Sequence, residues 1–115
     1  MKESAWKAFE LSRLIEKAEQ REAPYLEFLR VPQLSCGLYH LPAGAADQQT
    51  AHDEDEVYFV LKGRARIVVG SEERGIGPGS ILFVPADAEH RFFDVVEDLS
   101  LLVFFGSGGP SGAEV

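Results

Sequence analysis

The stretch Thr50–Gly63, TAHDEDEVYFVLKG, decides the fold of this chain. One histidine is followed by four acidic residues, and the sequence then changes to β-branched and aromatic residues typical of a strand. Strict alternation along EVYFVL places Glu56, Tyr58 and Val60 on one face of that strand. An ionised carboxylate on a buried face is costly unless it is paired or binds a cation. The stretch therefore predicts either a solvated acidic turn or a strand that directs Glu56 at a cation.

The composition narrows the class of protein. A chain of 115 residues with 45% hydrophobic residues is expected to form one soluble domain with a single core. The net charge of -8 argues against nucleic acid or an anionic membrane as partner and favours a neutral or cationic small-molecule ligand. Cys36 is the single cysteine, so no disulfide forms within the chain, which is consistent with a cytoplasmic location. No apolar run approaches the roughly 20 residues that cross a bilayer.

The order of local patterns predicts an all-β domain behind a helix. Apolar residues recur at helical spacing over 9–22, and Pro24 ends that segment. Seven short runs rich in β-branched and aromatic residues follow, separated by Gly, Pro or acidic residues: YLEFLRV, LSCGLYHL, EVYFVL, ARIVVG, SILFVP, HRFFDVV and LSLLVFF. Such spacing is typical of a sandwich or small barrel. We expect a helical segment at 1–24, a β-barrel at 25–106 and a flexible Gly/Ser/Pro-rich tail at 107–115.

Two of these runs are apolar on both faces. EVYFVL and LSLLVFF lack the clean alternation of a strand with one face in water, so a second layer is expected to cover them. The N-terminal helix is one candidate for that cover, and a second subunit is the other. We therefore expect a homodimer.

Two motifs then link the chain to a known family. The first, GAADQQTAHDEDEVYFVLKG, fits G-x5-H-x-H-x3-E-x6-G except that Thr50 stands at the first histidine position. The second, GSILFVPADAEHRFFD, fits G-x5-P-x-G-x2-H-x3-N except at Asp87 and Asp94. At both motifs, which span 44–94 with the strands between them, the chain resembles the cupin family. The resemblance implies a double-stranded β-helix, the jelly-roll barrel, preceded here by the N-terminal helix.

The resemblance also implies a metal centre. Carried over position by position, His52, Glu56 and His90 match the residues that bind one divalent ion in cupins, and Thr50 does not. Two imidazoles and one carboxylate suit non-haem Fe(II), and the same set accepts Mn, Ni or Zn. By strand parity Gln48 shares the face of His52 and is a candidate for the vacant ligand position, whereas a bulge would bring in Gln49 instead.

The remaining candidates are pocket residues. Thr50, Tyr58 and Phe92 are expected to line the ligand pocket, with His90, Phe92 and Asp94 alternating onto one face of their strand. Tyr58 is a candidate for catalytic proton transfer, and its alternative role is that of a core tyrosine with a satisfied hydroxyl.

Three functions are compatible with this sequence. The first is a metal-dependent enzyme of dioxygenase type acting on a small organic molecule. The second is a ligand-binding or sensory cupin without turnover. The third is a metal-free isomerase or lyase that uses His90 and Tyr58 as acid and base.

Overall fold

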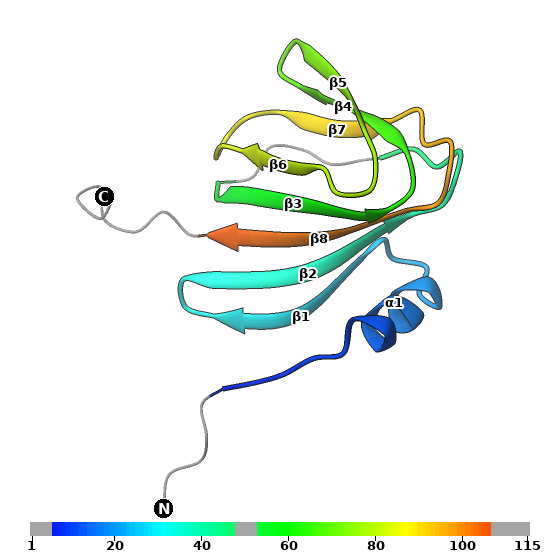
Figure 1. Ribbon diagram of the computed structural model, residues 1–115. Helices are drawn as coiled ribbons and strands as arrows, with labels where there is room; N and C mark the ends of the chain where they lie inside the picture. The colour runs from blue at the N-terminus through cyan, green and yellow to red at the C-terminus, as the bar shows by residue number, and fades with distance from the viewer. Residues whose placement is uncertain (1–5, 48–52, 107–115) are drawn as a thin grey trace, which may run out of the picture.

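The computed structural model describes residues 6–47 and 53–106. One helix, α1 (Leu11–Glu19), precedes eight strands in this part of the chain (Figure 1). The strands are β1 (Tyr25–Val31), β2 (Leu34–Leu41), β3 (Asp55–Lys62), β4 (Ala65–Val69), β5 (Glu72–Ile76), β6 (Ile81–Val84), β7 (His90–Phe93) and β8 (Leu99–Gly106). Within the described residues no helix is long and apolar enough to cross a membrane.

The strands form two antiparallel sheets. The larger has the order β1-β2-β8-β3-β6 and the smaller the order β5-β4-β7. The inward residues of both sheets make one core, which includes Tyr39, Tyr58, Ile67, Phe92 and Leu101. This confirms the jelly-roll architecture with an N-terminal helix that the sequence predicted.

Strand β3 has the faces that its alternation predicted. Glu56, Tyr58 and Val60 are at most 1% exposed, because all three point between the sheets. On β7, His90 and Phe92 are buried in the same interior. The prediction that Asp94 shares their face is wrong, since β7 ends at Phe93 and Asp94 takes a left-handed backbone conformation with φ of 50° and an exposed side chain.

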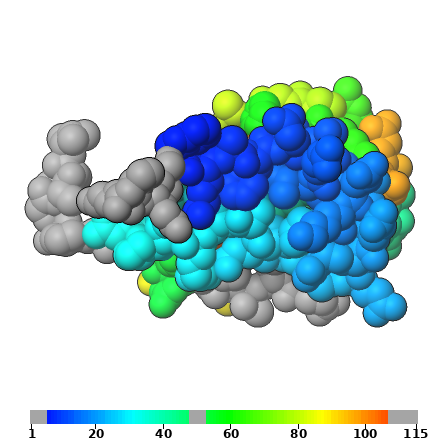
Figure 2. All heavy atoms as spheres, turned by 90° about the horizontal axis from the view of Figure 1, so that it is seen from below, coloured from blue at the N-terminus to red at the C-terminus, as the bar shows by residue number. Residues whose placement is uncertain are grey.

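Helix α1 is shorter than the 9–22 segment that periodicity indicated. It begins after Glu10, which provides no side-chain cap, and its backbone leaves the helical path at Gln20. Ala18 is the buried residue of α1 and packs with Leu26 and Leu38, on the outer face of the large sheet. Figure 2 shows this N-terminal segment lying across β1 and β2. The helix is therefore the second layer for that part of the sheet.

Another part of the outer face is not covered by any of the described residues. Phe83, Val57 and Phe104 stand side by side on β6, β3 and β8 and are 63%, 36% and 36% exposed. Ile81, also on β6, is 70% exposed. We call these four residues the outer apolar patch. The helix accounts for only part of the apolar outer face that the sequence predicted to be covered.

Candidate metal and ligand site

Two predicted metal ligands meet inside the barrel. Glu56 comes from β3 and His90 from β7, and their side chains are at most 1% exposed, with Glu56 Oε2 lying 3.4 Å from His90 Nε2. When two ligand atoms each lie about 2.1 Å from one ion, their separation depends on the ligand–ion–ligand angle. It is about 3.4 Å for a tetrahedral angle and about 3.0 Å for a right angle. The separation of this carboxylate and imidazole therefore fits a shared divalent ion.

The orientation of the His90 ring also fits metal binding. His90 Nδ1 lies 2.9 Å from the backbone carbonyl oxygen of Ala88. A carbonyl only accepts hydrogen bonds, so Nδ1 carries a proton and donates it. In the neutral ring Nε2 then presents its lone pair to the interior, where Glu56 also points. Such a carbonyl contact is the usual means of fixing a metal-binding imidazole in one tautomer.

Without an ion, the carboxylate and the ring stabilise each other. Burial lowers the pKa of His90, but the hydrogen bonds to Glu56 and to the Ala88 carbonyl outweigh it and raise that pKa above its ordinary value of 6.5. The protonated ring can then donate from Nε2 towards Glu56. A divalent ion at this position competes with that proton.

Tyr58 completes the cluster. Its hydroxyl donates to Glu56 Oε1 at 2.5 Å and lies 3.0 Å from His90 Nε2. The ring is 1% exposed and packs edge-on against Phe92 at a centroid distance of 5.1 Å. A hydroxyl within reach of both a carboxylate and an imidazole can hold or transfer a proton, so both alternatives raised for Tyr58 remain chemically open.

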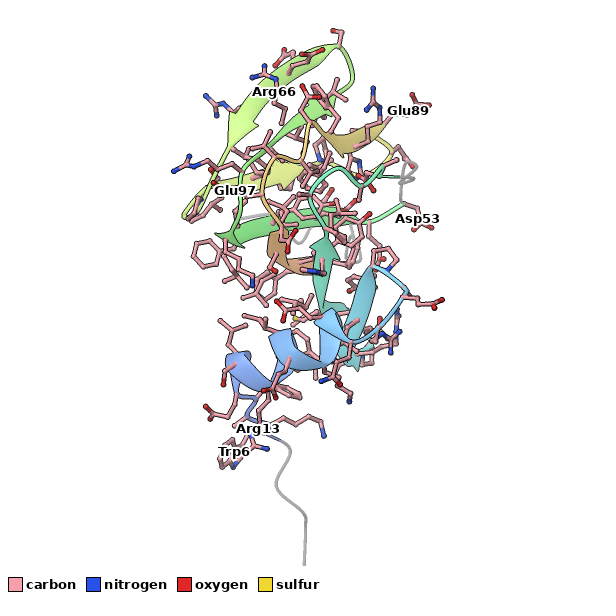
Figure 3. The ribbon with its side chains drawn as sticks, turned by 90° about the vertical axis from the view of Figure 1, so that its right-hand side faces the viewer. Trp6, Arg13, Asp53, Arg66, Glu89 and Glu97 are labelled. Carbon is pink, nitrogen blue, oxygen red and sulfur yellow. The ribbon has the colours of Figure 1, made fainter. Side chains whose placement is uncertain are left out.

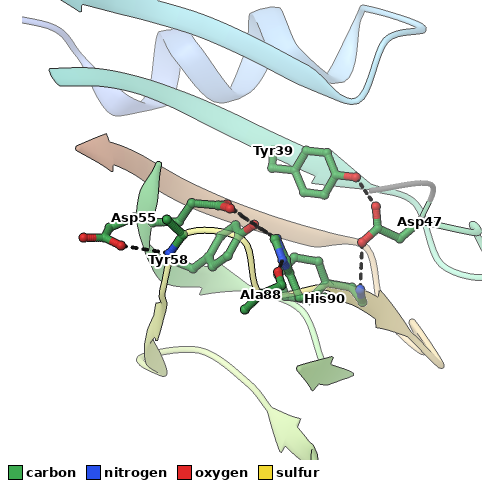
Figure 4. Close-up of polar contacts among 9 residues, drawn as sticks. Tyr39, Asp47, Asp55, Tyr58, Ala88 and His90 are labelled. Atoms are coloured by element: carbon green, nitrogen blue, oxygen red, sulfur yellow. Dashed lines mark hydrogen bonds and ion pairs between the residues drawn. The ribbon is translucent and has the colours of Figure 1, made fainter. Parts of the chain in front are cut away.

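Asp47 is a buried site residue that the sequence reasoning missed. It accepts a hydrogen bond from the Tyr39 hydroxyl and another, at 2.7 Å, from the backbone N–H of Phe92 (Figure 4). The carboxylate thereby joins β2 to β7 beside the cluster. In the sequence, Asp47 is a single acidic residue among small residues of the first motif. That pattern does not distinguish a buried carboxylate that joins two strands from an exposed loop residue.

The other predicted site residues divide into two groups. Phe92 is buried and packs against Tyr58, as expected for a residue beside His90. The positions of His52, Gln48, Gln49 and Thr50 lie outside the described residues. Within 6–47 and 53–106, no group of three His, Cys, Asp or Glu residues could hold a metal ion. Glu56 and His90 are thus the described part of the predicted centre.

The acidic run before β3 serves two purposes. Asp53 is exposed and points away from the barrel (Figure 3), and Asp55 is exposed and accepts a hydrogen bond from the Ala86 backbone N–H at 2.8 Å. Glu54 is half-buried at the mouth of a pocket, and Glu56 is fully buried. The first acids of this stretch therefore face solvent as a turn does, and the last one, Glu56, faces the interior; that Glu56 faces a cation stays a prediction.

The pocket above this cluster has a volume of about 310 Å³. All three tyrosines of the chain, Tyr25, Tyr39 and Tyr58, line it. Glu27 and Arg30 lie at its mouth and form a two-pronged ion pair, with nitrogen–oxygen distances of 2.7 and 3.1 Å. Its size and mixed aromatic and polar lining suit a small organic ligand. Tyr25 and Tyr39 were missed because nothing in the sequence gives the register that brings their strands together.

Comparison with known proteins agrees with this geometry. The family described as "Cupin domain" matches residues 37–105, which include both motifs and the strands that carry Glu56 and His90. The chain belongs to the cupin family. Within cupins, the chain is 46% identical over 99 residues to "Uncharacterized protein SCO3923" from Streptomyces coelicolor, a match that covers 86% of this chain and 94% of that protein.

Two solved cupin-like structures are also similar. The structure of TT1209 from Thermus thermophilus has a TM-score of 0.70 and 28% identity, covering 88% of this chain and 97% of that one. The structure of DMSP lyase DddQ from Ruegeria pomeroyi has a TM-score of 0.62 and 27% identity, covering 66% of this chain. The chain spans only 39% of the length of DddQ.

Proposed function

We propose that this cupin is a metal-dependent enzyme that acts on a small organic molecule in the barrel pocket. The observation that carries the proposal is the 3.4 Å approach of Glu56 Oε2 to His90 Nε2 in a buried site. His52 is the proposed third ligand, and Gln48 or Gln49 supplies a fourth in place of Thr50. Fe, Mn, Ni and Zn all accept this combination of nitrogen and oxygen donors.

The residues around the proposed ion have separable roles. When bound, a divalent ion polarises a substrate oxygen and stabilises negative charge that develops on it. Glu56 and His90 hold that ion, and the Ala88 carbonyl fixes the ring of His90. Tyr58 holds a proton at its hydroxyl oxygen, 2.5 Å from Glu56 Oε1. Phe92 packs on Tyr58 and helps to exclude water from the site.

Proton transfer is the reaction type that this geometry favours. The Tyr58 hydroxyl reaches a carboxylate and an imidazole at once, so it can give a proton to a substrate and regain one. That arrangement suits an isomerase or a lyase. The likeness to a structure named as a lyase, at 27% identity, supports the same class by analogy.

A dioxygenase is the second candidate. The specific support for it is the ligand set itself, since two imidazoles and one carboxylate leave positions on an Fe(II) ion for substrate and oxygen. Oxygen consumption with the substrate favours the dioxygenase, and turnover that proceeds without oxygen favours proton transfer. Ligand binding with no product in either assay would instead support a non-catalytic binding or sensory cupin.

Metal analysis tests the proposed centre. We expect protein purified without a tag or a chelator to hold about one divalent ion per chain. His52→Ala and His90→Ala should each lower that content at least tenfold while the barrel stays folded, because its packed core does not depend on the ion. Elemental analysis together with circular dichroism makes this comparison. Thr50→His should tighten binding, and Gln48→Ala or Gln49→Ala should weaken it according to which amide is a ligand.

His40 provides the matched control. It is the one other histidine of the chain, it lies on the outer face of β2, and its Nδ1 lies 3.2 Å from the Ser100 hydroxyl. His40→Ala should therefore keep the full metal content. Tyr58→Phe should also keep the ion but lose turnover. Unchanged metal in both His52→Ala and His90→Ala would contradict the site.

We also propose that the protein is a homodimer of the cytoplasm. The outer apolar patch supports the first part, because a second copy of the same flat face would cover Phe83 and Ile81. The single cysteine, Cys36, supports the second part; it is buried, and burial raises the pKa of its thiol.

A further inference from the structure

The Tyr25 hydroxyl is a buried polar group with no partner in the described structure. Its oxygen is inaccessible to solvent and makes no hydrogen bond to any described residue. Buried hydroxyls nearly always have a hydrogen-bond partner, and an exception calls for an explanation such as a ligand. This hydroxyl belongs to a residue that lines the 310 Å³ pocket.

The Tyr25 ring is held in place by its surroundings. It lies directly over Gly37 on the neighbouring strand β2, where any Cβ would overlap the phenol carbon and oxygen. Its edge contacts the Phe105 ring at a centroid distance of 6.0 Å, and the Tyr39 ring lies at 6.5 Å. Gly37 therefore creates the space that Tyr25 fills, and the hydroxyl has a fixed position before any ligand arrives.

The other two tyrosines of the pocket already use their hydroxyls. Tyr39 donates to Asp47, and Tyr58 donates to Glu56. Burial, with a smaller contribution from Glu27, raises the pKa of Tyr25, so its hydroxyl stays protonated at neutral pH. Tyr25 is thus the pocket tyrosine whose proton is available to a ligand.

The charges of the lining limit what the ligand can be. Arg30 and Glu27 neutralise each other at the mouth, and Glu54 adds a negative charge beside them. Among the described residues, Arg30 is the one cation of the lining and is already paired with Glu27, so the lining itself offers an anionic ligand no free partner. The hydroxyl needs an acceptor, and a cationic nitrogen is not one. A neutral molecule with an exposed oxygen meets both conditions.

We propose that Tyr25 is a specificity-determining residue that donates a hydrogen bond to the carbonyl oxygen of an uncharged substrate. The apolar body of that substrate packs against the rings of Tyr39 and Phe105. This inference rests on the proposed function, because it assigns the substrate class of the same pocket.

A pair of probes with the same shape tests this assignment. Cyclohexanone carries a carbonyl oxygen, and methylenecyclohexane replaces that oxygen with a carbon of similar size. We expect the full chain to bind the ketone about tenfold more tightly in titrations followed by NMR, which is the usual effect of satisfying a buried donor. Tyr25→Phe should bring the two affinities together, whereas His40→Ala, on the outer face of β2 and outside the pocket lining, should keep the preference.

Thermal unfolding separates a ligand role from a structural one. Tyr25→Phe removes no hydrogen bond of the described structure, so its melting temperature should equal or exceed that of the parent protein. A clear decrease would show that the hydroxyl has a structural partner and would overturn the proposal. Equal binding of the two probes, binding of neither, or a preference that survives in Tyr25→Phe would also overturn it. Metal content, measured on the same samples, reports on the metal centre separately.

Discussion

At the scale of single residues, the buried cluster of Glu56, Tyr58 and His90 can hold a proton at the position where the proposed metal ion would bind. Tyr58 donates to Glu56 Oε1, and His90 Nε2 lies 3.4 Å from the other oxygen of the same carboxylate. In the metal-free protein this arrangement satisfies a carboxylate that is 1% exposed. If the proposed ion binds, it would take the place of the proton on His90 Nε2 and supply the positive charge beside Glu56.

The stability of the metal-free protein should therefore depend on pH through His90. Because the folded-state pKa of His90 is raised above 6.5, the stabilisation is present below that value and is lost as pH rises through the folded-state pKa. In chelator-treated protein we expect the free energy of unfolding to decrease as pH rises from 6.5 through the folded-state pKa of His90. In His90→Gln the contribution of this ring to the decrease should be absent. Urea unfolding at several pH values measures it.

Metal affinity should change in the opposite direction. The ligand form of His90 is neutral, so binding should strengthen as pH rises through the same window. Identical pH profiles of stability for the parent protein and His90→Gln would show that the ring does not hold a proton against Glu56.

At the scale of strands, Asp47 connects β2 and β7, two strands that do not pair with each other. Its two oxygens accept from Tyr39 on β2 and from the backbone of Phe92 on β7, which belong to different sheets. Asp47 thus links β2 to β7 beside Glu56 and His90. Loss of that link should loosen the position of His90, which is two residues from Phe92 on β7.

Replacement of Asp47 by asparagine tests this link. The amide keeps one acceptor oxygen but presents an N–H₂ group to a second donor, so we expect a loss of about 2 kcal/mol in the free energy of unfolding. Tyr39→Phe removes only one of the two hydrogen bonds and should cost about half as much. Denaturant unfolding of both variants provides the values. A change below about 0.5 kcal/mol for Asp47→Asn would contradict a structural role for the carboxylate.

The strands also show which features the sequence could predict. Alternation along β3 predicted the inward faces of Glu56 and Tyr58 correctly, because a strand reverses side-chain direction at every residue. The same rule failed at Asp94, where the strand had already ended. It could not identify Tyr25 and Tyr39 as pocket residues or Asp47 as a buried neighbour of the cluster, since their positions depend on strand order and register. The site was therefore predictable where a motif marked it and not elsewhere.

At the scale of the whole molecule, the outer apolar patch marks where a second subunit would pack. Phe83 and Ile81 lie on β6, an edge strand of the large sheet, and Val57 and Phe104 continue the patch across β3 and β8. The helix covers the opposite end of this sheet, over β1 and β2 (Figure 2). These four side chains are apolar and exposed in the described structure, so pairing with a second copy would remove them from water.

A charge within this patch should separate the subunits. We expect the parent protein to be a dimer at micromolar concentration and Phe83→Glu to be a monomer, because a carboxylate would be buried without a partner at the interface. Val96→Glu is the matched control, since Val96 is 66% exposed but follows β7 of the small sheet. Light scattering coupled to gel filtration measures both. A monomeric parent protein, or dissociation of the two variants alike, would count against this interface.

The position of β8 has a consequence for how the protein is made. This last strand, Leu99–Gly106, pairs with β2 on one side and with β3 on the other, so the large sheet cannot join its two halves without it. During synthesis on the ribosome, the edges of β2 and β3 that pair with β8 stay unpaired until residue 106 has left the exit tunnel. The apolar strands LSCGLYHL and EVYFVL remain exposed to aggregation through that interval. The nascent chain is therefore expected to need chaperone protection until its final strand is released.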